Sequence, residues 1–194
     1  MADPAYIVDG VLTDGEAWIP LASNVYGSDA GTCTFTSPAD GSSTSWDQFM
    51  DLVVVGYCRA AASDPNAIVY MRLSGVTTAI YSYQFLRGSG SAVAGEAYDG
   101  QTVAPVAFLN ANTSTANCFG VFVCHLFDVN SGKYKSGVSQ GAADSDGSGW
   151  VSQYTWLQAS QAPVTSITFD NHHWGNWMAG SRFDLFGILP RMVA

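Results

Sequence analysis

"RFDLFGIL", residues 182–189, is a short apolar segment near the end of the chain, and it decides the fold class. It follows Ala179-Gly180-Ser181, a sequence typical of a turn, because glycine takes unusual backbone angles and serine hydrogen-bonds to nearby backbone. Alternation of side chains along a strand would place Phe183 and Leu185 on one face. Gly187 shares that face, where glycine lets another backbone approach closely. The segment is therefore predicted to be a closing strand that packs into a core.

Ten further segments are dominated by strand-forming residues and are separated by stretches rich in Gly, Pro, Asp and Ser. Only residues 45–52 resemble a helical turn. So many strands without helices between them exclude a parallel α/β sheet. We expect an all-β protein, an antiparallel β-sandwich that is jelly-roll-like and has about ten strands. The ten segments are 17–22, 32–36, 51–59, 67–73, 78–87, 102–110, 118–129, 133–142, 150–158 and 164–169.

Length and charge limit the organisation and the class of partner. The 194 residues predict a single domain over 16–194, preceded by an N-terminal arm over 1–15. Charged residues make up 12% of the chain, about half the usual share, and the net charge is −9. The sequence has no basic patch, so we expect neither nucleic acid nor an anionic membrane as a partner.

Four cysteines raise the question of disulfides. Cys58 and Cys124 lie in apolar runs, where a free cysteine behaves as a small buried hydrophobic residue, and neither Cys33 nor Cys118 belongs to a C-x-x-C motif. Residues 1–10 do not resemble a secretory signal, and no apolar run reaches the length of a membrane span. Free thiols and synthesis in a reducing cytoplasm are expected, and no cofactor is predicted.

Two segments could bind a metal, and both have a simpler interpretation. Adjacent His172 and His173 would point to opposite faces of a strand, so they rarely converge on one ion. The segment could instead be a loop in which Trp174 and Trp177 pack over the edge of the sandwich or contact a ligand. Residues 144–149 resemble the start of a calcium loop, but its twelfth position is Thr155 and not glutamate. A turn between strands is favoured there.

Signals of catalysis are missing from the sequence. There is no G-x-S-x-G motif, and no recognisable pairing of a cysteine with a histidine. Glu16 and Glu96 are the only glutamates, and no aspartate is distinguished from the others as a catalytic acid. We therefore expect a protein that is not an enzyme, with a hydrolase using two aspartates as the weakest alternative.

Aromatic side chains offer a second kind of site. Trp150, Tyr154 and Trp156 alternate on one predicted strand face, which could be core or a platform on which sugars stack. The candidate ligand or partner contacts are Trp174, Trp177, His172, His173, Trp150 and Trp156.

The C-terminal third resembles the ending of a group of small phage virion proteins found in tail appendages and on head surfaces. Residues 51–60, 81–91 and 132–143 also resemble strands of that group. Phe186 stands where tyrosine is more usual, and 189–194 extends past the common end. The resemblance implies a β-sandwich building block used in multiple copies. The matching residues are Pro163, Thr165, Ser166, Ile167, Ala179, Gly180, Ser181, Arg182, Phe183, Leu185, Gly187 and Ile188.

This resemblance, together with the low charge content, predicts a structural protein of a bacteriophage virion. A capsid decoration or cement protein on the outer surface of the particle is the first expectation. A tail appendage, or a receptor-binding carbohydrate-binding module that contacts a host glycan, is the alternative. Expected partners are the major capsid protein or tail proteins, and further copies of the chain in a homo-oligomer, with a trimer as one candidate.

Overall fold

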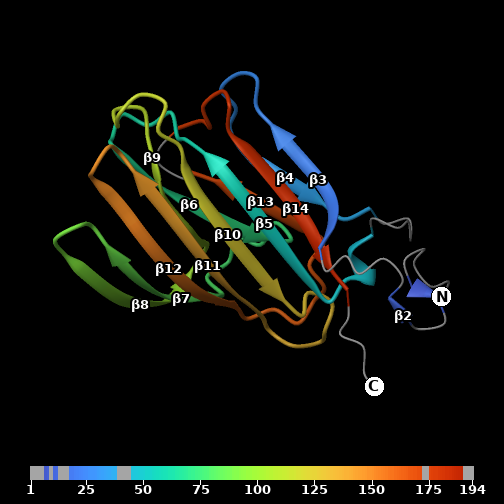
Figure 1. Cartoon of the computed structure of the whole chain (residues 1–194). Coiled ribbons are helices and arrows are strands. Elements are labelled where there is room, and N and C mark those ends of the chain that lie inside the picture. The colour runs from blue at the N-terminus through green and yellow to red at the C-terminus, as the bar shows by residue number, and fades with distance from the viewer. Residues whose placement is uncertain (1–6, 9–10, 13–17, 39–44, 172–174, 190–194) are drawn as a thin grey trace.

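A computed structural model describes residues 7–8, 11–12, 18–38, 45–171 and 175–189. Figure 1 looks onto an eight-stranded antiparallel sheet, with a four-stranded antiparallel sheet behind it. The predicted all-β antiparallel sandwich is confirmed, with twelve strands in its two sheets. The larger sheet has the order β3 (Ile19–Val25), β14 (Arg182–Ile188), β5 (Asp51–Cys58), β10 (Gly120–Phe127), β11 (Lys135–Asp144), β12 (Gly149–Gln158), β7 (Tyr81–Gly88), β8 (Val93–Gln101). The smaller has the order β4 (Cys33–Thr36), β13 (Ser166–Asp170), β6 (Asn66–Leu73), β9 (Ala104–Asn110).

The elements outside these sheets are short. The expected helical turn is present as a single 3-10 turn, Trp46–Gln48. Within the expected N-terminal arm, β1 (Ile7–Val8) and β2 (Val11–Leu12) pair with each other, and the rest of the arm lies outside the described residues. The extension beyond residue 189 also lies outside them.

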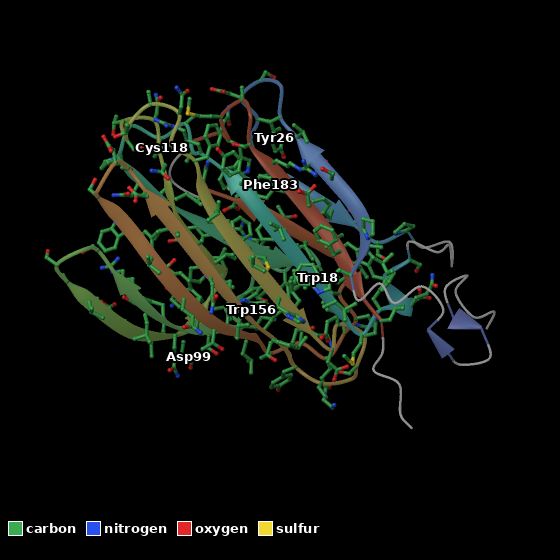
Figure 2. The ribbon with its side chains drawn as sticks, in the orientation of Figure 1. Trp18, Tyr26, Asp99, Cys118, Trp156 and Phe183 are labelled. Atoms are coloured by element: carbon green, nitrogen blue, oxygen red, sulfur yellow. The ribbon has the colours of Figure 1, made fainter. Side chains whose placement is uncertain are left out.

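The predicted closing strand, β14, lies inside the larger sheet between β3 and β5. Phe183 and Leu185 point into the core, as expected, and Figure 2 shows Phe183 on this strand. Gly180, at φ +91°, supplies the left-handed turn that precedes it. The expectation for Gly187 needs a correction. A side chain there would meet the ring of Phe49 at 2.4 Å, so the close neighbour is an aromatic ring and not a backbone.

The core lies between the sheets and is built from the alternating inward side chains of both. A buried hydroxyl also connects them. The Tyr81 hydroxyl on β7 accepts hydrogen bonds from the Leu73 backbone N–H and from the Gln158 side-chain amide, each 2.9 Å long. Removal of this hydroxyl would leave a buried donor without its partner, which is costly.

One strand, β8, was not predicted from the sequence. Its residues include two glycines and two acidic residues, all of them poor strand formers, and nearly all of its side chains are exposed. It forms a strand because its backbone pairs with the edge of β7. The β7–β8 hairpin projects beyond the four-stranded sheet, at the left of Figure 1.

All four cysteines are free, as expected. Cys58 and Cys124 are fully buried, whereas Cys118 is half-buried in the loop region at one end of the sandwich (Figure 2). Desolvation raises the pKa of the Cys58 thiol well above its usual value and that of Cys124 to about 12.

In the folded protein, only Cys118 is expected to react rapidly with an aromatic disulfide reagent at pH 8. A pKa of about 12 leaves roughly one Cys124 thiol in ten thousand ionised at that pH, and the thiolate is the reactive form. The measurement is the number of thiols that react in the fast phase, with and without denaturant. Cys118→Ser should remove the fast phase. A fast phase that persists in this variant would contradict the prediction.

Candidate functional site: an apolar sheet face

The outward face of the eight-stranded sheet is unusually apolar. Along β10, Phe122 and Cys124 point into the core, so Val121 and Val123 point outward. Strand pairing extends these two positions into two rows across the sheet. The first row is Tyr57, Val121, Ala142, Val151, Gly88 and Val93, and the second is Val55, Val123, Gln140, Gln153, Leu86 and Gly95. We call these twelve residues the outer face.

The outer face carries no charged side chain, although the chain has a net charge of −9. The first charges beside it are on β14, where Arg182 and Asp184 pair with each other at 2.7 Å. Several of its side chains are highly exposed: 85% for Val93, 67% for Val151 and 61% for Leu86. A shallow open groove runs between them.

The side chains of the outer face are of the kind that could bury apolar area against a partner. Its twelve residues include no carboxylate, imidazole, amine or thiol, and the Tyr57 phenol is their one ionisable group. Contiguous exposed apolar patches larger than a few hundred Å² are rare on monomeric proteins, and those that occur mark interaction sites. Removing it from water would contribute about 25 cal/mol for each Å² buried.

The outer face was not predicted from the sequence, although residues 118–127 contain a signal for it. Residues 118–127 are apolar at odd and even positions alike, which is typical of a strand buried on both faces. The second sheet covers one face of β10. Among the residues that the structure describes, no element covers the other, and Val121 and Val123 are exposed.

Of the six residues predicted to contact a ligand or partner, the structure describes three. Trp156 and Trp177 are 2% and 0% exposed, so the expectation that they contact a ligand is corrected: both rings lie in the core (Figure 2 labels Trp156). Tyr154 is 2% exposed, so the predicted row of aromatic residues is core at two of its three positions. Only Trp150 is half-buried. Trp174, His172 and His173 lie outside the described residues.

The inward face of the β7–β8 hairpin carries a second group of aromatic rings. Tyr83 and Tyr98 stack with centroids 5.0 Å apart, and Phe85 lies 5.4 Å from Tyr154. Burial raises the pKa of Tyr83 to about 12. Tyr98 remains 40% exposed, because the hairpin projects beyond the smaller sheet.

In the part of the chain that the structure describes, no three side chains of the metal-binding types come together. Residues 144–149 form the turn between β11 and β12, where the Asp144 carboxylate accepts a hydrogen bond from the Gly147 N–H. Within the described ranges, no helix has the length and apolar character needed to cross a membrane.

Neither a family model nor a curated protein matches the chain. One solved structure that superposes on it is the CBM40 of the Ruminococcus gnavus IT-sialidase bound to alpha2,3 sialyllactose, at 6% identity and a TM-score of 0.22, covering 89% of this chain and 94% of that one. A similarity of this size supports no statement about fold or ligand.

Proposed function

We propose that the protein is a structural component of a bacteriophage virion, a decoration protein that attaches to the outer surface of the capsid through its outer face. The observation that carries this proposal is the outer face, an exposed and uncharged surface on a strongly acidic protein. The phage assignment rests on the resemblance of residues 163–188 to the ending of small virion proteins. Attachment would take place by burial of apolar area, without a covalent or catalytic step.

The proposed partner is the major capsid protein, with further copies of this chain beside it in a homo-oligomer, for which a trimer is one candidate. Repeated copies on a shell would gain stability by mass action, because binding favours the folded state. An uncharged docking face also allows copies of an acidic protein to approach without placing like charges opposite each other.

The second candidate is a tail appendage that uses the same face against a tail protein. It is favoured by the same resemblance, which covers head-surface and tail proteins alike. The location of the binding partner separates the two candidates.

Binding to separated virion parts tests the proposal. Purified protein would be mixed with heads and with tails of the phage that encodes it, after both are stripped of accessory proteins, and co-sedimented. We expect binding to heads. The double variant Val121→Lys/Val151→Lys should weaken that binding at least about tenfold, because it places two charges in the buried area.

Val25→Lys is the matched control. Val25 is also an exposed valine on the larger sheet, but it lies on β3, beyond Arg182 and outside the outer face. This variant should bind as the unmodified protein does. Binding to tails alone would replace the decoration proposal with the tail appendage. Binding to neither part would overturn the proposed function.

A further inference from the structure

Arg87 occupies an aromatic cage on the inward side of the larger sheet, opposite the outer face. Its guanidinium carbon lies 4.9 Å from the ring centroid of Trp150, 5.2 Å from that of Phe108 and 5.5 Å from that of Phe85. The three rings come from β12, β9 and β7, so the cage forms only when both sheets are in place. Cation–π attraction holds the guanidinium in position.

Arg87 differs from the other arginines in the described ranges because it has no anion or carbonyl as a partner. Arg59 donates to four backbone carbonyls, at Asn112, Ser114, Thr115 and Cys118. Arg72 pairs with Asp170, and Arg182 pairs with Asp184. Arg87 forms neither a hydrogen bond nor an ion pair with any described residue; its Nε is buried without a partner, as are those of Arg59 and Arg72.

A guanidinium with no polar partner among the described residues is unexpected in a protein of net charge −9 if it serves only packing. Five N–H donors in a rigid planar fork match the geometry of a carboxylate. The cage holds that fork in place before a ligand arrives, which lowers the entropic cost of binding. The position is therefore suited to an anion supplied from outside the chain.

The aromatic row beside the cage indicates the rest of the ligand. Tyr83 lies four residues from Arg87 on β7 and pairs with Tyr98 on β8, so the row extends about 13 Å from the guanidinium at the rise of a strand. Tyr98 is exposed, and its hydroxyl donates to the Glu96 carboxylate. Exposed aromatic faces and a carboxylate acceptor are the groups that contact the C–H face and the hydroxyls of a sugar ring.

Polar groups flank the other end of the cage. Beyond Trp150, an open groove between loops is lined by Ser89, Ser91 and Asn66. A sugar placed against Trp150 would find hydrogen-bond partners there. The length of the aromatic row fits two or three sugar rings, whereas a single small anion would leave Tyr98 unused.

We propose that this surface binds an acidic oligosaccharide, with Arg87 pairing with a carboxylate of a sugar acid and Tyr98 stacking against a neighbouring ring. The site lies on the opposite side of the sheet from the outer face, so it does not depend on the proposed capsid attachment. Failure of either proposal leaves the other intact.

Calorimetric titration with a galacturonic acid trisaccharide tests the site, with the uncharged galactose trisaccharide as the comparison. We expect the acidic sugar to bind at least about tenfold more tightly, and the difference to shrink as salt is raised because part of the attraction is electrostatic. Arg87→Gln should abolish the preference for the acidic sugar. Arg182→Gln, which alters an arginine on the opposite side of the sheet, should not change it.

Thermal unfolding of each variant separates binding from folding. If Arg87→Gln does not fold, Arg87→Lys and Tyr98→Ala decide instead: the first keeps the charge but loses the fork, and the second removes an exposed ring. Each should weaken binding of the acidic trisaccharide several-fold without a change in fold. Unchanged binding in these variants, or no binding by the unmodified protein, would overturn the proposal. Tighter binding of a sulfated trisaccharide, or equal binding of an acidic hexapeptide, would also overturn it.

Discussion

Deletion of residues 182–194 is expected to abolish folding. The deletion removes β14 from the interior of the larger sheet, so β5 loses one of its two neighbours and β3 loses its only partner in the sheet. It also removes Phe183, whose ring packs against Trp177 at 5.1 Å and against Phe169 at 5.8 Å. The loss of an interior strand with its buried side chains is expected to exceed the 5–15 kcal/mol that stabilises a typical domain.

Circular dichroism and thermal unfolding of the purified truncated chain provide the measurement. The expected result is a chain without a cooperative transition, recovered mostly as aggregate. Deletion of residues 190–194 alone is the control, and it should leave a folded protein with a cooperative transition. A cooperative transition in the longer deletion would contradict the place of β14 inside the sheet.

Trp177→Ala is expected to lower the free energy of unfolding by about 3–5 kcal/mol, the usual cost of truncating a buried tryptophan. The ring is fully buried and contacts Phe183. The backbone of Trp177 exchanges two hydrogen bonds with Ala30 and bridges to Ala60, so the residue joins segments that are distant in the sequence. The cavity left by the ring could not close without moving these segments.

Urea denaturation measures the change. Trp18→Ala is the matched control: Trp18 is 43% exposed and its ring contacts the Phe186 ring in a tilted arrangement, with centroids 5.6 Å apart, so its removal should cost about 1 kcal/mol or less. A loss of less than about 1 kcal/mol for Trp177→Ala would contradict its place in the core and restore it as a candidate ligand contact.

Much of the fold follows from local sequence. All eleven predicted segments coincide with strands of the two sheets, because alternation, β-branched residues and intervening turns act over a few neighbouring residues. The closing strand and its inward Phe183 and Leu185 follow from the same periodicity. β8 could not be predicted from the sequence, because it becomes a strand by pairing with β7 and not through the propensities of its own residues.

The candidate sites could be predicted less well. Residue type alone suggested that Trp150, Trp156 and Trp177 contact a ligand or partner, yet Trp156 and Trp177 lie in the core. Tryptophan is common both in cores and in binding surfaces, so its presence does not distinguish the two. The cage around Arg87 could not be predicted from neighbouring residues either, because its three rings come from strands that are far apart in the sequence.

The sequence by itself determined the fold class, the positions of most strands and which side chains share a face of each strand, because these depend on neighbours along the chain. Only the tertiary structure decided which faces are covered. Val121 and Phe122 are adjacent and equally apolar, but the second sheet buries Phe122 and leaves Val121 in solvent. That difference depends on the order in which distant strands pair, and it separates a core from a surface that can bind a partner.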